Sequence, residues 1–553
     1  MSPLIQQLPI LPILLPLLAG ACMLLLPDGW RRSRIALPLL STLLQTGVAF
    51  ALLAMAAGAL PAYWPEGIAV YTLGAWSAPF GIVLVADRLA AVMLSLSAIL
   101  GLAALVYSLA RWDHMGAHFH PLFQFLLMGL NGAFLTGDLF NLFVFFEVLL
   151  AASYGLVLHG SGTLRVRAGL HYIAVNLAGS LVFLIGAALI YGAAGTLNMA
   201  DLAARLPTLA GSERTLLEAG CAILGAAFLL KAGVWPLNFW LVNAYGSAAA
   251  PVAALFSIMT KVGIYALLRL TTLFSATGGP APFNGPWLFW IGMATLLLSS
   301  AAMLTEQKPQ RLVAYCVIVS AGTLLAGFGI GGPIMAGATL FYLISSVLAT
   351  GAFFMLCEMI ERSQSYGANI LAITMESFGV DDPVYSDRPD EVVGIAIPAA
   401  MAFLGFAFAS CALLVTGMPP LSGFVAKFWM LSAALETAPG MAPPALSRVL
   451  LIAVLASGLA GVIALSRMGS RLFWGTQERS KPRLRVIEAG PVMLLVLLSV
   501  TLALAADPAV RYLQATGAAL YAPQTYIQAV LPPAAATASP PAQVPAQVPG
   551  AAP

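Results

Sequence analysis

Charged residues are scarce in this sequence. Asp, Glu, Lys and Arg make up 8% of its 553 residues, whereas hydrophobic residues make up 60%. Soluble domains usually carry roughly 25% charged residues, so this chain has too few to cover a surface in contact with water. The mean hydropathy of +0.93 indicates the same environment. We therefore predict an integral membrane protein whose many apolar spans share one interior.

Motifs for cofactors, nucleotides and nucleic acids are also missing. The net charge is only +3, and no basic run with interleaved aromatic residues occurs, so we expect no nucleic-acid partner. The sequence has no P-loop, no dinucleotide-binding glycine motif at a strand–helix turn and no nucleophile elbow. We therefore expect a protein that is not an enzyme and that binds no cofactor.

Cysteine is rare, and its spacing does not suggest a metal site. The five cysteines are scattered within or next to apolar runs, and no pair has the spacing of metal ligands. We interpret them as small buried hydrophobic residues. The closely spaced His114, His118 and His120 lie in a short interfacial loop, and we predict no metal there.

Long apolar runs recur along the whole chain. A bilayer core needs about 20 apolar residues per helix, and fourteen such runs can be counted, which predicts an all-α membrane fold of about fourteen transmembrane helices. The first run lacks a basic start and a small-residue cleavage site, so we predict a spanning helix and not a signal peptide. The runs are 4–26, 36–59, 83–109, 121–137, 140–159, 168–193, 216–244, 248–274, 286–305, 310–331, 334–360, 394–436, 447–473 and 487–506.

Two of these runs are too long for one plain crossing. The run 216–244 is interrupted at Pro236, and the run 394–436 is interrupted around Pro419 and Pro420. They become broken helices 7 and 12, each the fourth crossing of a five-helix block, which suggests an inverted repeat with a site at mid-membrane. The predicted parts are helices 1–3 (1–110), a first repeat of helices 4–8 (111–274), a second repeat of helices 9–13 (275–475), helix 14 (476–510) and a periplasmic low-complexity tail (511–553).

The distribution of Lys and Arg between loops predicts the orientation in the membrane. If the N-terminus lies outside, loops on the inside hold sixteen Lys and Arg residues and loops on the outside hold five. Positive charge accumulates in cytoplasmic loops, so we expect both termini to be periplasmic in a multi-pass protein of the bacterial inner membrane. The longest polar insert, 363–393, is predicted to be a cytoplasmic loop.

Four charged residues inside predicted spans stand out as candidates for an ion path: Glu147, Lys231, Lys261 and Lys427. A charge at the bilayer centre costs roughly 2.5 kcal/mol or more, so it is seldom there without a function. The alternatives are a carboxyl that only packs between helices, and lysines that extend to the interface. Burial disfavours the charged form of an amine, and a nearby carboxylate restores it. Movement of Glu147 relative to Lys231 would therefore switch the lysine between holding and releasing a proton.

The prolines of the broken helices leave backbone groups without partners. Proline has no N–H, so Pro236 frees the carbonyl of Ala232, and the Pro419–Pro420 pair frees the carbonyls of Val415 and Thr416. Unpaired backbone at membrane depth is tolerated only where it is buried in protein or lines a cavity. At the junction of two runs, Asp138 is predicted either to cap the following helix or to open an ion entrance.

The segment from Gly129 to Glu147 resembles the D-type subunit of the multisubunit Mrp/Pha/Mnh cation/proton antiporters. The segments 230–241, 250–256, 260–265 and 417–424 are similar to the same family, and they are shared with the antiporter-like subunits of respiratory complex I. The resemblance covers about residues 1–510. It implies broken helices 7 and 12, an assembly of six or seven kinds of subunit, and exchange of Na+ or K+ for protons.

The same resemblance implies a role for each charged residue. It makes Glu147 and Lys231 a switching pair, Lys261 a central relay and Lys427 a terminal proton group. The sequence departs from the wider pattern at Ser345 and Thr350, where histidine and lysine are common in the family. Hydroxyl groups can donate and accept hydrogen bonds, so we predict that these side chains, together with Tyr315, Ser320 and Ser346, line and order a water chain between Lys261 and Lys427. The alternative function is that of a proton-pumping membrane subunit in an NADH-quinone oxidoreductase or membrane hydrogenase.

Overall fold

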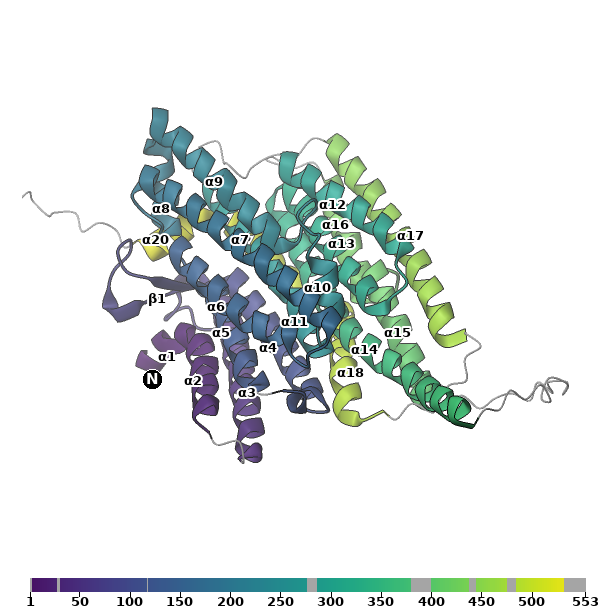
Figure 1. Ribbon diagram of the computed structural model, residues 1–553. Coiled ribbons are helices and arrows are strands. Elements are labelled where there is room, and N and C mark those ends of the chain that lie inside the picture. Colours follow the sequence, from purple (N-terminus) through teal and green to yellow (C-terminus); the bar gives the residue numbers. More distant parts are fainter. Residues whose placement is uncertain are drawn as a thin grey trace, which may run out of the picture.

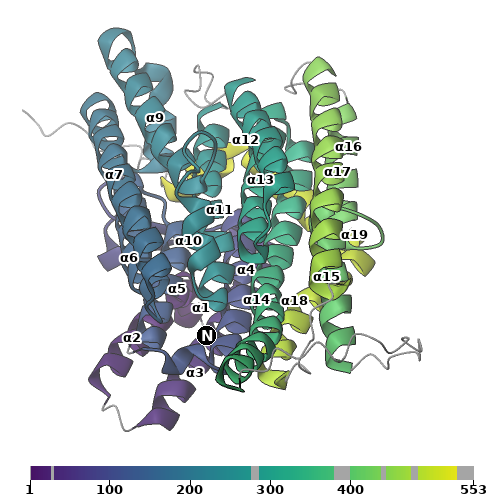
Figure 2. The same cartoon turned by 45° about the vertical axis from the view of Figure 1, so that its right-hand side comes forward.

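The computed structural model describes residues 2–26, 30–116, 118–275, 286–378, 399–436, 444–474 and 484–531. Within them the chain forms helices that lie side by side in one bundle, with the N-terminal helices at one end and α15 to α17 at the other (Figure 1, Figure 2). The first ten are α1 (Ser2–Gln7), α2 (Leu11–Leu25), α3 (Arg31–Ala56), α4 (Arg88–Ser108), α5 (Phe119–Leu135), α6 (Leu139–Leu158), α7 (Thr163–Ala194), α8 (Met199–Arg205), α9 (Gly211–Ala232) and α10 (Leu241–Ser247). The others are α11 (Ala250–Ser275), α12 (Pro286–Thr305), α13 (Pro309–Ile330), α14 (Pro333–Phe378), α15 (Ala399–Thr416), α16 (Ser422–Leu435), α17 (Pro444–Trp474), α18 (Val486–Leu504), α19 (Ala506–Leu520) and α20 (Pro523–Val530).

The lengths and compositions of these helices are those of a membrane protein. Among the described residues, 13 helices are long and apolar enough to cross a membrane, and α5 and α16 are shorter apolar helices. Large apolar side chains such as Leu177, Leu181 and Ile185 on α7 are more than half exposed. Soluble proteins rarely expose so large an apolar surface to water, so these faces are expected to contact lipid.

One short sheet departs from the predicted all-α fold. Strands β1 (Ala69–Thr72) and β2 (Val83–Ala86) pair antiparallel, with Ala69 opposite Ala86. All four residues of β2 are buried, and Leu84 forms a further bridge to Thr136 between α5 and α6. The hairpin thereby fixes the chain immediately before α4, where Asp87 begins that helix.

Both predicted helix breaks are present, and in each the helix ends at a glycine before the proline is reached. Helix α9 ends at Ala232, where Gly233 has a φ of +65°, and Gly417 follows α15 with a φ of +76°. Glycine adopts this left-handed conformation without the steric cost that a Cβ imposes. The prolines follow a few residues later, so glycine and proline together separate the two halves of each broken helix.

Helices α11 and α14 lie at the centre of the bundle. In their most apolar segments 100% and 94% of the residues are buried, against 39% for α7 and for α17. Helix α14 contacts α11, α13, α16 and α18. It extends to Phe378, so the prediction of a loop over 363–393 is wrong for residues 363–378, and 379–393 lie outside the described residues.

The predicted low-complexity tail 511–553 is wrong up to residue 530. Helix α19 packs on α14, and α20 packs on α8. The contact with α14 is close, because a Cβ on Gly517 would lie 2.1 Å from the carbonyl oxygen of Pro333. Both helices are amphipathic, with mixed apolar and polar residues. Such a pattern escapes a search for long apolar runs, and residues 532–553 lie outside the described part of the chain.

Four of the five cysteines fit the predicted role of buried hydrophobic residues, and one does not. Cys221, Cys316, Cys357 and Cys411 are buried, whereas Cys22 is exposed on α2.

Candidate functional site

The three predicted lysines lie on three different helices and are all buried. Lys231 on α9 is 5% exposed, Lys261 on α11 is 1% exposed and Lys427 on α16 is 9% exposed. Each ammonium group donates hydrogen bonds to groups inside the bundle. The alternative in which these lysines extend to the membrane interface is therefore wrong.

Glu147 on α6 is connected to Lys231 through a third residue. Ser180 on α7 donates a hydrogen bond to Oε1 of Glu147, and Nζ of Lys231 donates to Oγ of Ser180 at 3.0 Å. Glu147 is half-buried rather than buried. The predicted partners are thus close in space but not in direct ion-pair contact, because the serine hydroxyl lies between them.

Lys231 also binds the backbone of α7. Its Nζ donates to the carbonyl of Asn176 at 3.2 Å and lies 5.8 Å from the ring centre of Phe146. The carbonyl of Ala232, which the sequence suggested because of Pro236, is not its partner. The side chain instead points toward α7, which approaches α9 closely at Gly179, where a Cβ would lie 2.2 Å from a side-chain carbon of Leu230.

Lys261 lies at the start of a chain of hydroxyl groups. Its Nζ donates to Oγ of Ser320 at 3.1 Å and to the carbonyl of Val317 at 3.4 Å, both on α13. Ser320 in turn donates to Oγ of Ser346 on α14 at 2.9 Å. The central lysine is thereby linked to the helix that contacts α16, on which Lys427 lies.

Lys427 occupies the break of the second interrupted helix. Its Nζ donates to the carbonyl of Thr416 at 2.7 Å and to that of Val415 at 3.4 Å. These are the two carbonyls that the Pro419–Pro420 pair was predicted to free, so the expectation is confirmed here. A Cβ on Gly417 would lie 2.5 Å from Cδ of Lys427, so the lysine reaches these carbonyls along the bare face of that glycine.

The two hydroxyl residues predicted to bridge the lysines have different surroundings. Ser345 is 1% exposed, and its Oγ lies 2.9 Å from Oγ of Ser422, at the start of α16. Thr350 instead donates to the carbonyl of Ser346 at 2.7 Å, within its own helix. The structure therefore brings Ser345 to the helix of Lys427, places the expected Ser320 and Ser346 beside Lys261, and adds Ser422 to the polar groups between the lysines.

Asp138 caps a helix, as one of the two alternatives predicted. Its Oδ1 accepts a hydrogen bond from the backbone N–H of Asn141 at 2.9 Å and so satisfies a free donor at the start of α6. Burial raises the pKa of Asp138, and the hydrogen bonds from the backbone of Asn141 and Phe140 oppose this shift. Its backbone also bridges to Asn198, which caps α8.

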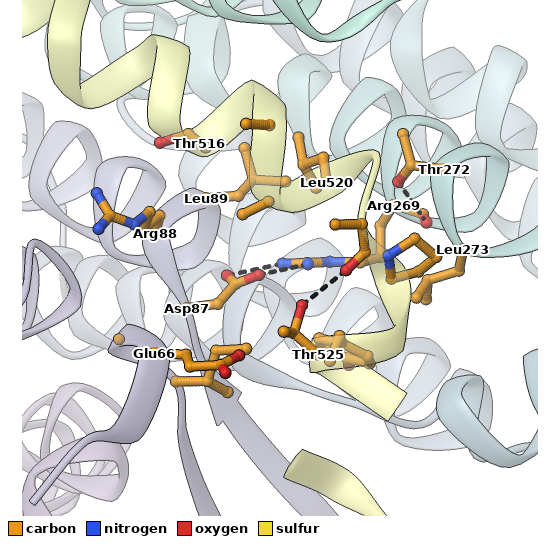
Figure 3. Close-up of a pocket in the computed structure, with 17 residues that line it drawn as sticks. Glu66, Asp87, Arg88, Leu89, Arg269, Thr272, Leu273, Thr516, Leu520 and Thr525 are labelled. Carbon is orange, nitrogen blue, oxygen red and sulfur yellow. Dashed lines mark hydrogen bonds and ion pairs between the residues drawn. The ribbon is translucent and has the colours of Figure 1, made fainter. Parts of the chain in front are cut away.

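A buried ion pair near one end of α11 escaped the sequence analysis. Arg269 and Asp87 are 4% and 9% exposed, and the guanidinium donates to both carboxylate oxygens, at 2.5 and 2.9 Å. The pair borders a cavity of about 290 Å³. Figure 3 shows the pair together with lining residues of α19 and α20, among them Thr516, Leu520 and Thr525. Arg269 lies inside the predicted run 248–274, so its charge within an apolar run could have indicated a buried ion pair.

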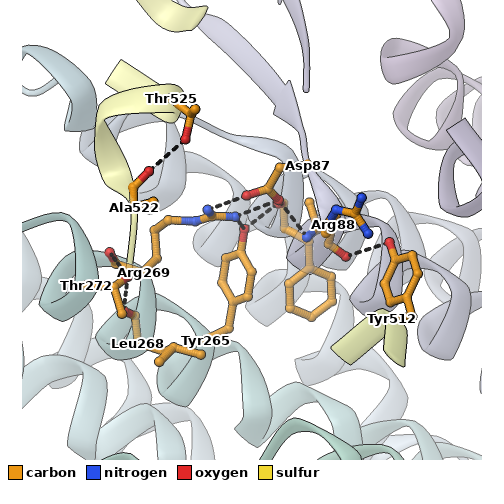
Figure 4. A network of polar contacts seen from close by, with 11 residues as sticks. Asp87, Arg88, Tyr265, Leu268, Arg269, Thr272, Tyr512, Ala522 and Thr525 are labelled. Atoms are coloured by element: carbon orange, nitrogen blue, oxygen red, sulfur yellow. Dashed lines mark hydrogen bonds and ion pairs between the residues drawn. The ribbon is translucent and has the colours of Figure 1, made fainter. Parts of the chain in front are cut away.

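The ion pair joins parts of the chain that are far apart in sequence. Figure 4 shows Arg269 between Asp87 and the hydroxyl of Tyr265, to which it donates at 3.2 Å. Tyr265 donates to the carbonyl of Phe134 on α5, and the ring of Tyr526 on α20 lies 5.2 Å from the guanidinium. Helices α4, α5, α11 and α20 therefore meet at this one arginine.

Glu358 is a second buried charge that the sequence analysis missed. It is 9% exposed on α14, inside the predicted run 334–360. Both of its carboxylate oxygens accept from Nε1 of Trp112 at 3.0 Å, and one also accepts from the backbone N–H of Ala250 at 3.2 Å. The carboxylate therefore lies at the N-terminus of α11, where the helix dipole favours a negative charge.

These residues define a polytopic membrane protein with a row of buried amines and hydroxyls through its interior. Among the described residues, no group of three or more His, Cys, Asp or Glu side chains could hold a metal ion.

Comparison with known proteins gives the family. Residues 136–451 match the family described as "NADH:quinone oxidoreductase/Mrp antiporter, TM". The D-type subunit of a probable K(+)/H(+) antiporter of Rhizobium meliloti is 52% identical over 95% of this chain and 98% of its own length. The D-type subunit of the Na(+)/H(+) antiporter of Alkalihalophilus pseudofirmus is 31% identical over 95% of this chain and 99% of its own length.

The fold agrees with that similarity. A chain in the structure of the Mrp complex from Dietzia sp. DQ12-45-1b superposes with a TM-score of 0.76 at 27% identity, over 95% of this chain and 99% of that one. The chain belongs to the family of D-type subunits of the Mrp/Mnh antiporters, which is related to the antiporter-like subunits of complex I. It is thus one component of a multisubunit cation/proton antiporter, and the nearly full-length matches to D-type antiporter subunits favour this function over the respiratory alternative.

Proposed function

We propose that this chain provides the proton path of a complex that exchanges Na+ or K+ for protons across the bacterial inner membrane. The observation that carries the proposal is the row of three buried lysines, each bonded to polar groups inside the bundle, with Glu147 joined to the first of them through Ser180. The names of the two relatives specify K+ in one case and Na+ in the other. The proposal is compatible with either cation, because the path through this chain carries only protons.

The charged residues take the following roles. Glu147 and Lys231 form the switching pair, because a change in their connection alters which of them holds the proton. Lys261 is the central relay, since it is the most enclosed of the three amines. Lys427 is the terminal proton group at the break between α15 and α16, where the carbonyls of Val415 and Thr416 stabilise its ammonium form.

Serine hydroxyls carry the proton between Lys261 and Lys427. Ser320 and Ser346 lead away from Lys261, and Ser345 and Ser422 lead toward the start of α16. Ser345 and Ser346 lie on the same turn of α14, but adjacent side chains of a helix point in different directions, so the two hydroxyl pairs need a further group between them. Water ordered by these groups and by Thr350 completes the route, as hydroxyls both donate and accept hydrogen bonds.

The proposed fold has fourteen crossings in two inverted five-helix repeats. If α5 is counted as a short crossing, the candidate spans number fourteen, and α10 and α16 are the second halves of broken helices 7 and 12. Corresponding helix pairs make contact in both blocks: α5–α6 and α12–α13, α6–α7 and α13–α14, α7–α10 and α14–α16, and α9–α11 and α15–α17. The excess of Lys and Arg in alternate loops supports periplasmic termini.

The partners of this chain are the other subunits of the antiporter, in an assembly of six or seven kinds of subunit. Among the described residues, the charged side chains inside the bundle are bonded to protein groups, and none forms a closed cluster of oxygen ligands for a dehydrated cation. The cation therefore crosses at a site that other subunits complete.

The test is transport by the whole complex in sealed vesicles, with Na+ and K+ supplied in turn. Glu147→Ala and Lys231→Ala should each abolish exchange while the complex still assembles, because each removes one end of the switching pair. Glu218→Ala is a matched control, since Glu218 lies on the same helix as Lys231 but forms only an i,i+4 pair with Arg214, with its side chain 45% exposed. Normal exchange by an assembled Glu147→Ala complex would refute the switching role.

A further inference from the structure

The contact between Glu147 and Lys231 is made by one side chain, Ser180. This residue is 4% exposed and lies on α7, between α6 and α9. Glu147 accepts its hydroxyl hydrogen, and Lys231 donates to its oxygen at 3.0 Å. We propose that Ser180 is the proton-transferring bridge of the switching pair, an inference that rests on the proposed function.

Among the described residues, no other contact of the pair can serve as this bridge. The second acceptor of Lys231 is the backbone carbonyl of Asn176, which accepts hydrogen bonds but has no proton to pass on. Phe146 meets Lys231 only through its ring face. The hydrogen bond from Ser180 is the one that leads from Glu147 toward the lysine. A hydroxyl both accepts and donates, so Ser180 has the chemistry that transfer requires.

The transfer step is balanced in protons and charge. One N–H bond of the Lys231 ammonium breaks as its proton binds Oγ of Ser180, and the O–H bond of Ser180 breaks as its proton binds the carboxylate of Glu147. The products are a neutral amine, a neutral carboxyl and a hydroxyl whose new hydrogen points toward Lys231. The reverse sequence returns the proton to the lysine, and no other reactant is needed.

The same hydroxyl has a second acceptor, which gives the bridge two positions. Ser180 can also donate to the carbonyl of Asn176, one turn earlier in α7, at 3.1 Å. A hydroxyl has a single hydrogen, so it is directed either to Glu147 or to Asn176. The first position connects the pair, and the second disconnects Glu147 while Lys231 keeps its bond to the serine oxygen. Rotation of one side chain thus opens and closes the proton connection.

Close packing of α7 on α9 holds the serine in place. A Cβ on Gly179 would lie 2.2 Å from a side-chain carbon of Leu230 and 3.8 Å from Cε of Lys231, and a Cβ on Gly186 would lie 2.8 Å from the backbone of Leu224. The absence of side chains at these glycines lets the two helices approach each other. Ser180 is therefore fixed at hydrogen-bond distance from Lys231.

The experiment measures cation/proton exchange by the whole complex in vesicles, normalised to assembled complex, over a range of pH. Ser180→Ala removes the bridge and should slow exchange by about tenfold or more, because transfer through a positioned group is lost. Ser180→Thr keeps a hydroxyl at the same place and should restore most of the rate. Ser95→Ala is the control, as Ser95 is buried on α4 and its hydroxyl donates to the carbonyls of Ala91 and Ala49.

Each outcome decides between the bridge and the wider proposal. Slow exchange in Ser180→Ala with recovery in Ser180→Thr supports the bridge, because a role in packing alone would not need the hydroxyl. Full activity in Ser180→Ala, with Glu147→Ala and Lys231→Ala inactive, overturns the bridge and leaves the switching pair intact. Full activity in all three overturns the proposed function itself. Equal loss in Ser180→Ala and Ser180→Thr also overturns the bridge.

Discussion

At the scale of single residues, serine hydroxyl groups lie between Lys261 on α11 and the helix of Lys427. Ser320, Ser346, Ser345 and Ser422 form two hydroxyl pairs, each with an O–O distance of 2.9 Å. A hydroxyl does not hold a proton as a stable charged intermediate, but it orients a neighbouring water or hydroxyl for transfer. The proposed path between Lys261 and Lys427 should therefore depend on the shape of a small polar space more than on the charge of its lining.

This dependence on shape can be tested at Ser345. Ser345→Ala should slow exchange modestly, since one hydrogen bond is lost, whereas Ser345→Leu should block exchange because the larger side chain displaces water and Ser422. Thr339→Val is the control on the same helix, because its buried hydroxyl donates to the carbonyl of Met335 within that helix. Exchange rates of the assembled complex provide the measurement, and a fully active Ser345→Leu complex would exclude this route.

At the scale of elements, the two broken helices place lysines beside free backbone groups. In α15–α16 the break exposes the carbonyls of Val415 and Thr416 to the ammonium of Lys427. The break requires Gly417 for two reasons: its φ is +76°, and its missing side chain leaves space for the lysine. The helix end and the position of the charge are therefore set by the same residue.

Gly417→Ala should disturb both features. The left-handed conformation costs a residue with a Cβ about 1–2 kcal/mol, and the new methyl group would lie 2.5 Å from Cδ of Lys427, which must leave its carbonyl partners. We expect slower exchange and a lower melting temperature of the complex.

The control for this change is Gly405→Ala on the same helix. A Cβ there would meet only one ring carbon of Phe473, at 3.9 Å, so neither rate nor stability should fall. If Gly417→Ala behaved like Gly405→Ala in both measurements, the proposed link between the break and Lys427 would be wrong.

At the scale of the whole molecule, the Arg269–Asp87 ion pair connects the central helix α11 to the start of α4 and to α20. Asp87 follows the β-hairpin and caps α4, Arg269 lies on the helix of Lys261, and Tyr526 comes from α20. Removal of one partner from a buried ion pair leaves an uncompensated charge. This pair therefore secures the position of α11 relative to the rest of the bundle.

Arg269→Ala should destabilise the protein by about 3–5 kcal/mol, because Asp87 would remain buried without its partner. Arg511→Ala is the matched control: it breaks an Arg–Asp pair in α19 whose side chains are 77% and 71% exposed, and such a pair contributes within about 0.5 kcal/mol. Thermal unfolding of the detergent-solubilised complex measures both. Equal melting temperatures for the two variants would contradict the structural role of the buried pair.

A further expectation at this scale concerns the isolated chain. Purified alone and reconstituted in liposomes, it should exchange neither Na+ nor K+ for protons, since its buried lysines suit protons and no group of three or more His, Cys, Asp or Glu side chains among the described residues could hold a metal ion. The assembled complex in the same liposomes is the positive control. Robust exchange by the single chain would show that the cation path also lies within it.

The sequence by itself determined the environment, the class of fold and the chain's charged positions. Long apolar runs predict spans because each one only has to match the thickness of a bilayer. Glu147, Lys231, Lys261 and Lys427 were recognisable because a charge within such a run is costly. The carbonyls that bind Lys427 could also be predicted, because a proline cannot donate the helical hydrogen bond to the carbonyl four residues earlier.

Only the tertiary structure decided which groups those charges contact. Ser180 looks like any polar residue in an apolar helix until the close packing of α7 on α9 brings it between Glu147 and Lys231. Asp87 and Arg269 lie a few residues inside two separate predicted runs, and only helix packing shows that they are buried together as a pair. Hydrogen-bond partners between helices depend on rotation and spacing of the helices, which local composition does not encode.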